Sequence, residues 1–271
     1  MKDFQVLLSY CSVIIALMST YYLNYRGIVQ VSGKDAPGFL QNLTSNDIKK
    51  LEEKKLIYSL LLSPQGKILY DFFIFRLGDD FYLDCHKEYA QEIVRKLSAY
   101  ILRSDVKVES QPHFLVYVSQ DQLTPYCYAD PRNSEIGFRG YATSINELAK
   151  FALEDEVLDE YTKKRLMLLI PEFGCDFTSG EFFALDLGMD KINAVSFNKG
   201  CYVGQEVTAR MNYRGKNKKC LAMIDLEDFE IKGREIFKEQ KKAGVLLKAY
   251  QNKALALMKN DAYGSVEIEE L

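Results

Sequence analysis

A succession of strand-like segments joined by tight turns constrains the fold of this 271-residue chain more than any other feature. Residues 55–62 and 67–77 are rich in aliphatic and aromatic side chains, and the turn-forming segment Ser63-Pro64-Gln65-Gly66 separates them. A second turn at residues 78–80 leads into a third such segment, residues 81–85. Strands joined by connections this short pair in antiparallel fashion, because the connection reverses the chain direction.

Single helices are expected between the groups of strands. Residues 87–102 place apolar side chains at helical spacing, and an earlier helix is expected to begin near Ala36 and Pro37. Alternating apolar residues predict further strands at residues 27–32, 106–109 and 114–119. Strands that are joined by hairpins and interrupted by single helices are typical of the α+β class with largely antiparallel sheets.

The second half of the chain adds one long helix and a group of short strands. Residues 144–147 form a capping-box pattern that opens a helix, which Pro171 ends. Its acids at residues 154–160 precede its bases at residues 163–165, an order that complements the helix dipole, so we interpret it as helix stabilisation and solubility rather than a metal site. Short strands at residues 221–226, 243–250, 254–258 and 266–268 predict a small C-terminal β-barrel.

The N-terminal segment admits three interpretations. Residues 4–24 contain no charged side chain and are long enough to cross a membrane, but polar residues dilute them. The preceding Met1-Lys2-Asp3 has no net side-chain charge and is a poor start for a signal peptide. The alternatives are an early helix and a translation start at Met18, which would make residues 1–17 an extension that is not part of the protein. A membrane partner is expected only if residues 4–24 are retained.

Composition excludes several classes of site. The chain is 48% hydrophobic and 27% charged, which is ordinary for a soluble globular protein, and its net charge of −3 argues against general nucleic-acid binding. The six cysteines include no C-x-x-C pair and there are only two histidines, so a zinc site of common spacing or a self-contained cluster site is not expected. Thiols without a disulfide framework suit a reducing compartment.

The segment Lys199-Gly200-Cys201-Tyr202-Val203-Gly204-Gln205-Glu206 contains the main candidate functional residue. Its two glycines permit positive φ and predict a tight loop around Cys201, and residues 205–211 are expected to form a short helix with Gly204 near its N-cap. The helix N-terminus and Lys199 favour the thiolate, whereas Glu206 opposes it if it lies close. The alternatives are a small buried cysteine and an ordinary surface pair of Lys199 with Glu206.

The residues that follow the motif are strongly basic. The bases between residues 199 and 219 are Lys199, Arg210, Arg214, Lys216, Lys218 and Lys219. Glu206 is the only acid there, so the segment has a local net charge of +5. A local positive field attracts anions such as a folate glutamate tail or RNA phosphates. A solvated loop is the alternative.

The motif resembles the K-G-C-[FY]-x-G-Q-E signature of the YgfZ-type folate-binding family. These proteins are relatives of the glycine-cleavage aminomethyltransferase and support the maturation of iron–sulfur proteins. The similarity extends to F-L-Q…L-T-S-N-D at residues 39–47, to S-P-Q-G-K at residues 63–67 with Asp71, and to D-P-R…G-x-R at residues 130–139. It also includes Tyr161, Arg165, residues 170–174 and Asp176, so that it covers about residues 27–219.

The resemblance implies a fold, a ligand and a site. It implies an aminomethyltransferase-like body at residues 18–219 that binds tetrahydrofolate or a derivative, followed by the β-barrel at residues 220–271. Cys201 is the expected functional thiol, and any iron–sulfur cluster on it is transient and shared, because one cysteine cannot hold a cluster alone. The residues expected to bind folate or another ligand are Asp71, Lys199, Gly200, Tyr202, Gly204, Gln205, Glu206, Arg210 and Arg214.

The resemblance also implies partners and a location. The expected partners are iron–sulfur assembly proteins and client enzymes, including tRNA-modifying ones, in the cytoplasm or, in a eukaryote, the mitochondrial matrix. The aminomethyltransferase has two adjacent acids where this chain has Tyr70-Asp71, which argues against enzyme activity of that kind. The competing hypotheses are a folate-dependent aminomethyl or one-carbon transferase that uses Asp71, and an RNA-binding or scaffold protein that uses the basic segment.

Overall fold

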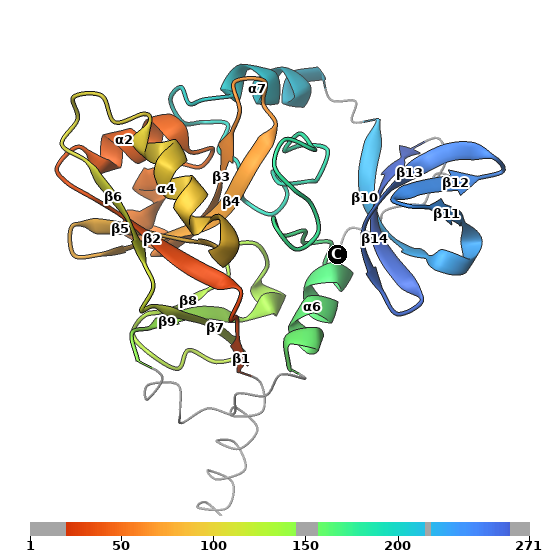
Figure 1. Ribbon diagram of the computed structural model, residues 1–271, viewed down its shortest axis with the longest axis horizontal. Coiled ribbons are helices and arrows are strands. Elements are labelled where there is room, and N and C mark those ends of the chain that lie inside the picture. Colours follow the sequence, from red (N-terminus) through yellow and green to blue (C-terminus); the bar gives the residue numbers. More distant parts are fainter. Residues whose placement is uncertain (1–19, 145–156, 215–217, 261–271) are drawn as a thin grey trace, which may run out of the picture. The chain divides into compact units, whose positions relative to one another are not determined.

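The computed structural model describes residues 20–144, 157–214 and 218–260 (Figure 1). The chain divides into two compact units, and the division falls inside strands β3 and β4. Unit 1 comprises residues 1–40, 48–58 and 72–164, and unit 2 comprises residues 41–47, 59–71 and 165–271. The N-terminal extension at residues 1–17, most of the capping-box helix start and the strand at residues 266–268 lie outside the described residues. The predicted domain boundaries stay predictions.

Antiparallel sheets dominate the first half of the chain, as the hairpin pattern predicts. One sheet has the strand order β3-β4-β5-β2-β6 and a second has the order β1-β7-β9-β8. The strands are β1 Tyr21–Tyr22, β2 Arg26–Ser32, β3 Leu56–Leu62, β4 Ile68–Leu77, β5 Asp80–His86, β6 Lys107–Gln111, β7 Leu115–Ser119, β8 Cys127–Ala129 and β9 Phe138–Ala142. Strands β1, β8 and β9 were not predicted. Strand β9 buries a charged residue, Arg139, where the alternation rule expects an apolar one.

Short helices connect the strands. They are α2 Ala36–Leu43, η1 Ile48–Lys50, α3 Leu51–Lys54, η2 Lys87–Tyr89, α4 Ala90–Ser98, η3 Ser134–Ile136, α6 Val157–Met167, α7 Gln205–Arg214 and η4 Leu226–Asp228. The helix predicted at residues 87–102 ends at Ser98, and Leu102 is 88% exposed, so the prediction was wrong for its last turn. The described residues include no helix with the length and apolar character needed to cross a membrane.

Unit 1 encloses a buried ion cluster. The carboxylate of Asp84 accepts hydrogen bonds from Arg26 Nε at 2.7 Å, from Arg139 Nε and from the Tyr141 hydroxyl at 3.2 Å. Burial alone raises the pKa of Asp84, but the guanidinium groups of Arg139 and Arg26 outweigh it and hold that pKa below its ordinary value. The guanidinium of Arg139 also lies 4.0 Å from the centre of the Phe73 ring.

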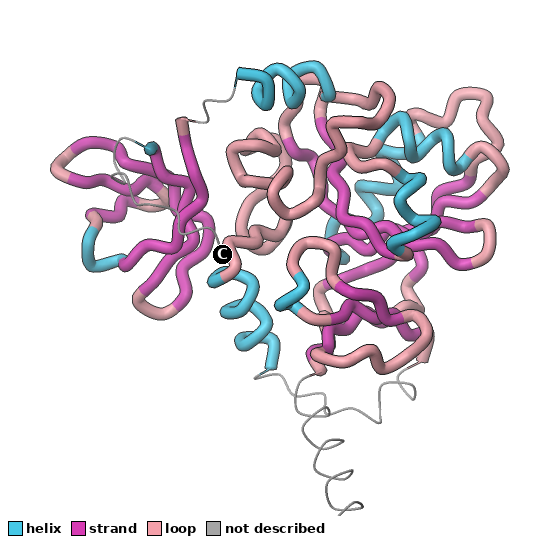
Figure 2. The backbone as a smooth tube through the Cα atoms, turned by 180° about the vertical axis from the view of Figure 1, so that it is seen from behind, coloured by secondary structure: helices cyan, strands magenta, loops and turns pink. Residues whose placement is uncertain are grey.

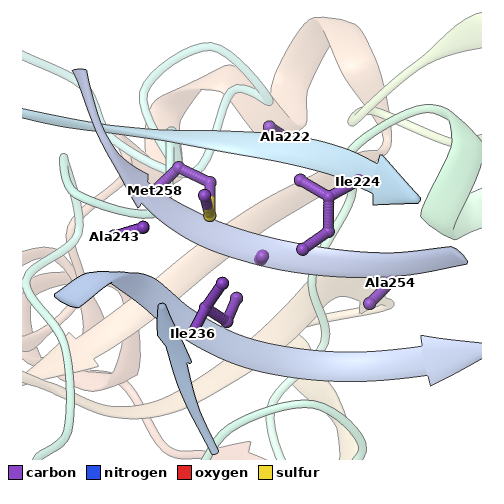
Figure 3. Close-up of a cluster of buried hydrophobic side chains, with 7 residues drawn as sticks. Ala222, Ile224, Ile236, Ala243, Ala254 and Met258 are labelled. Carbon is purple, nitrogen blue, oxygen red and sulfur yellow. The ribbon is translucent and has the colours of Figure 1, made fainter. Parts of the chain in front are cut away.

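An open antiparallel sheet forms the C-terminal part of unit 2. Its strands are β10 Lys219–Asp225, β11 Glu230–Lys232, β12 Glu235–Lys238, β13 Lys241–Tyr250 and β14 Lys253–Lys259, in the order β10-β14-β13-β12-β11. Small and aliphatic side chains form a buried cluster on one face (Figure 3): Ala222, Ile224, Ile236, Ala243, Ala254, Ala256 and Met258. The strands predicted at residues 221–226, 243–250 and 254–258 are confirmed, whereas β11 and β12 were missed. The predicted closed barrel is not confirmed, because β10 and β11 end the strand order of the described sheet.

Candidate functional site

The 199–206 segment lies in unit 2, at the end of a long irregular stretch between α6 and α7, which Figure 2 shows as loop. Gly204 directly precedes α7, as predicted, and α7 extends three residues beyond the predicted end. The side chain of Cys201 is exposed, whereas Lys199 and Tyr202 on either side of it are buried. Of the two alternatives that the sequence left open, the structure therefore selects the exposed thiol.

The ammonium group of Lys199 points into the protein. It is 7% exposed and donates to the backbone carbonyls of Gln41 at 2.7 Å, Asn46 at 2.9 Å and Thr44. An ammonium has three N–H donors, so these bonds fill its capacity, and the Tyr202 ring lies 4.9 Å from Nζ. The charge of Lys199 thus fastens residues 41–46 to the loop beside Cys201.

A surface pair between Lys199 and Glu206 is the wrong interpretation of this motif. Glu206 pairs instead with Arg210 one helical turn later, at 2.7 Å, and both side chains are exposed. An exposed pair at this spacing contributes little to stability. Nothing about Lys199 in this geometry depends on Glu206, because its donors are directed to carbonyl oxygens.

The two glycines of the motif have different roles. Gly204 has a φ of +83°, and a Cβ on it would lie 2.6 Å from the carbonyl oxygen of Ser63. Gly66 has a φ of +79°, and its Cβ would lie 2.8 Å from Cβ of Val207. The turn between β3 and β4 therefore packs closely against the start of α7 (Figure 1). Gly200 has neither a positive φ nor any atom within 4 Å of a built Cβ, so the conformational prediction was wrong for Gly200.

Residues 41–47 connect the loop to β3. The hydroxyl of Ser45 donates to the carbonyl of Ala194 at 2.6 Å and accepts from the backbone N–H of Leu60 at 2.9 Å. The side-chain amide of Asn46 donates to the carbonyl of Asn193 at 2.7 Å. These bonds join three segments that are far apart in the sequence, and they all come from the region that resembles L-T-S-N-D.

Asp71 and Arg165 are two further buried charged residues of unit 2. Asp71 is 1% exposed, and its carboxylate accepts from the backbone N–H of Phe173 at 2.8 Å. Arg165 is ion-paired with Asp176 and donates to the carbonyl of Ile170 at 2.8 Å. The interpretation of the α6 bases as a source of solubility does not hold for Arg165, because this side chain is buried.

Three side chains of helix α7 that were predicted to bind a ligand lie on one exposed stripe together with Tyr213, which was not predicted. Gln205, also predicted, is half-buried at the start of the helix. Glu206, Arg210, Tyr213 and Arg214 recur at spacings of three and four, which places them on one face, and Tyr213 is 94% exposed. The opposite face is held inside, where the Thr208 hydroxyl donates to the carbonyl of Gly204 at 3.2 Å. Burial raises the pKa of the neighbouring Tyr202 to about 12.

Sequence reasoning missed the groups that hold the loop. The sequence does not reveal the roles of Gln41, Thr44 and Asn46, because they act through backbone carbonyls, which every residue type has. Phe197 was missed as well: it is 39% exposed two residues before the motif, and an aromatic residue close to the candidate loop is the signal that could have found it. Within the described ranges, no group of three or more His, Cys, Asp and Glu side chains is placed to hold a metal ion.

Comparisons with known proteins relate the chain to two groups. Residues 23–118 match the family model of the GCVT N-terminal domain. The chain is 33% identical over 214 residues to the iron-sulfur cluster assembly factor IBA57 homolog, mitochondrial, of Mycosarcoma maydis, which covers 70% of this chain and 53% of that protein. It is 29% identical over 238 residues to the mitochondrial IBA57 of Mus musculus, covering 76% and 66%. The chain thus spans about half to two thirds of the length of these relatives.

A solved structure resembles the chain in fold. The glycine cleavage system aminomethyltransferase T from Bartonella henselae superposes with a TM-score of 0.68, over 89% of this chain and 78% of that chain. The two sequences are only 15% identical, so the likeness concerns the fold alone. The prediction of an aminomethyltransferase-like α+β fold is confirmed.

Proposed function

We propose that this chain supports the assembly or repair of iron–sulfur clusters in client enzymes through the thiol of Cys201. The observation on which this depends is an exposed cysteine on a loop whose neighbours are fixed from inside. The relatives from Mycosarcoma maydis and Mus musculus bear the name of iron-sulfur cluster assembly factors, which supports the same function. The wider motif also supports membership of the YgfZ-type family.

In this arrangement, one residue of the loop is available to react and others hold the loop in place. A thiolate is the form of cysteine that ligates metal or attacks a disulfide, and Cys201 is accessible for either role. One thiolate cannot hold a cluster, so the remaining ligands come from a partner protein or client. Lys199, Tyr202 and Gly204 hold the loop from within, and Cys201 is the group that a partner meets.

We also propose that the body binds tetrahydrofolate or a derivative, a carrier of one-carbon units. The residues present suit a reduced pterin ring in their chemistry. Asp71 supplies a carboxylate acceptor for ring N–H groups, and the backbone N–H of Phe173 donates to that carboxylate. The Phe173 ring lies against the Tyr70 ring, with ring centres 5.3 Å apart. A fluorescence titration of the purified chain with tetrahydrofolate tests this. Saturable binding that is weakened by Asp71→Asn would support the proposal. Absence of binding by the wild type would contradict it.

A one-carbon transferase is the alternative that shares this site. Tyr70 occupies the position of the second acid and is buried in edge-to-face contact with Phe173, so it supplies no carboxylate. The geometry therefore favours a non-enzymatic role. Incubation with methylenetetrahydrofolate and candidate amines tests the alternative, and turnover that is lost in Asp71→Asn would establish it.

RNA binding is the second alternative, and the exposed stripe of α7 favours it. Tyr213 offers a ring on which a base stacks, and Arg210 and Arg214 flank it. Binding of a single-stranded RNA would weaken steeply as salt is raised. A salt-independent response, or no binding, would exclude this use of α7.

The proposed cellular setting follows from the same comparison. The proposed partners are iron–sulfur assembly proteins and client enzymes, with tRNA-modifying enzymes among them. The relatives carry the word mitochondrial in their names, which supports a matrix location in a eukaryotic cell, and the cytoplasm is the reducing compartment in a bacterial one.

Client activity in cells that lack this protein tests the proposed function. Aconitase, a [4Fe–4S] enzyme, is assayed after expression of the wild type, Cys201→Ser or the control Cys175→Ser at equal protein levels. Cys175 is a half-buried thiol outside the motif, so its loss is expected to leave rescue intact. Rescue by the wild type and Cys175→Ser but not by Cys201→Ser supports the proposal. Equal rescue by all three would contradict it.

A further inference from the structure

Arg139 is a buried arginine of β9 whose two terminal nitrogens have no acceptor among the described residues. Its side chain is 0% exposed, and its Nε donates to the carboxylate of Asp84. Nη1 and Nη2 are shielded from solvent, and no described atom accepts a hydrogen bond from either of them. A guanidinium has five N–H donors, so most of those of Arg139 are left unbonded. Burying such donors is costly, and an acceptor on a bound molecule would remove that cost.

The neighbours of Arg139 attract its charge but do not supply these acceptors. The carboxylate of Asp84 also accepts from Arg26 Nε at 2.7 Å, so one negative charge is shared between two guanidinium groups. The Phe73 ring, 4.0 Å from the guanidinium carbon, attracts the positive charge, but a phenyl ring has no oxygen to accept from an N–H group. The surroundings of Arg139 are therefore suited to an additional negative charge.

Two other buried arginines indicate what kind of anion such a group binds. Arg132 donates from Nε at 3.0 Å and from Nη2 at 2.8 Å to the two carboxylate oxygens of Asp130. Arg165 donates from Nη1 and Nη2 to the two carboxylate oxygens of Asp176. In both pairs, one carboxylate accepts from two nitrogens of a planar guanidinium, which is the geometry that suits both groups. Arg139 differs because, within the described ranges, no carboxylate of the chain bonds its two terminal nitrogens.

We propose that Nη1 and Nη2 of Arg139 bind a small carboxylate anion inside unit 1. The two oxygens of the anion accept from the two nitrogens, as those of Asp176 do from Arg165, and its charge complements a guanidinium that has only a share of Asp84. The ligand is a molecule of few atoms, because protein shields both nitrogens from solvent. The site belongs to unit 1, whereas Cys201 belongs to unit 2, and it does not depend on the proposed function.

The test is the urea unfolding midpoint of the purified full chain as sodium formate replaces sodium gluconate at constant ionic strength. Both salts supply a carboxylate, but gluconate is too bulky for an enclosed site, and a ligand that binds only the folded chain raises its stability. Arg139→Lys keeps a positive charge beside Asp84 and removes the planar pair of nitrogens. Arg76→Lys is the matched control, because Arg76 is exposed and pairs with Asp79 at the surface.

The expected result is an unfolding midpoint that rises with formate in the wild type and in Arg76→Lys and stays constant in Arg139→Lys. The same rise in all three chains, or no rise in the wild type, overturns the site. An equal rise when chloride replaces gluconate overturns the assignment to a carboxylate, because a halide has no second oxygen.

Equilibrium dialysis of the wild type with carbon-14 formate provides a second measurement, which decides the matter if Arg139→Lys does not fold. Saturable uptake of one formate by each folded chain supports the site. Uptake no greater than that of the chain unfolded in urea overturns it.

Discussion

The ion cluster around Asp84 in unit 1 and the loop around Cys201 in unit 2 each contain a residue of a motif that resembles the same family, Arg139 and Cys201, but their charged and reactive groups are exposed to different degrees. In the cluster, the carboxylate and both guanidinium groups are turned toward each other and no side chain of the three is exposed. In the loop, Lys199 is turned inward and Cys201 outward, two residues apart. The contrast separates motif residues that make contacts within the protein from Cys201, whose thiol is exposed.

Removal of the cluster's acid should have the largest effect. Asp84→Ala leaves the guanidinium groups of Arg26 and Arg139 buried without their counter-charge, and breaking such a pair costs ~3–5 kcal/mol. The free energy of unfolding in urea measures this. Asp79→Ala is the control, because Asp79 pairs with Arg76 at the surface and its loss should be undetectable. A small effect of Asp84→Ala would mean that the cluster does not hold unit 1 together.

The second largest loss of stability is expected from substitution of Lys199, the inward-facing lysine of the loop. Lys199→Met removes the donor to the carbonyls of Gln41, Thr44 and Asn46 and leaves them buried, which should cost ~2–4 kcal/mol. Urea unfolding measures it, and Lys218→Met, which changes an exposed lysine, is the control. If the two variants were equally stable, Lys199 would have no structural role.

Substitution of the two motif glycines by alanine should have clearly different effects on stability. Gly204→Ala combines an unfavourable φ of +83° with a Cβ that meets the Ser63 carbonyl, and it should destabilise unit 2 by ~1–3 kcal/mol. Gly200→Ala meets no atom and should change stability by less than ~0.5 kcal/mol. Equal unfolding midpoints for the two variants would contradict the division of the loop into an inner and an outer side.

Lowering the pH should gradually reduce the contribution of the Asp84 cluster to the free energy of unfolding. The pKa of Asp84 is depressed in the folded state, so its contribution is present above the unfolded pKa of about 4 and is lost as pH falls through the lower folded value. The loss amounts to ~1.4 kcal/mol for each pKa unit of depression. The measurement is the unfolding free energy of the wild type and of Asp84→Asn from pH 7 to pH 2. The stability difference between them should shrink below about pH 4, and a constant difference would show that Asp84 does not titrate as described.

Local patterns predicted most of the fold. The Ser63–Gly66 turn between two apolar runs was enough to place β3 and β4, because turn chemistry and hydrophobicity agree there. Strand β9 was missed because its second residue, Arg139, is charged and buried, and the distant Asp84 makes that burial tolerable. The last predicted turn of α4 failed because periodicity alone does not show whether Leu102 has a surface to pack against.

The sequence indicated Cys201 as a candidate residue, but it did not indicate the residues that hold its loop in place. Cys201 stands out because a thiol between glycines before a helix has a local signature. The clamp on Lys199 depends on carbonyls more than 150 residues earlier, so no local window contains it. The open space at Gly200 and the exposure of Phe197 are properties of the folded surface, which sequence spacing does not encode.

The most direct test of the account is the alkylation rate of each cysteine by iodoacetamide in the native chain, followed by mass spectrometry at several urea concentrations below unfolding. The account predicts that Cys201 reacts at once and at a rate that urea does not change, because its thiol is already exposed. Buried Cys85 and Cys127 should react only through opening, so their rates should rise with urea. A Cys201 rate that is slow and rises with urea like theirs would contradict the claim that the loop presents this thiol to other molecules.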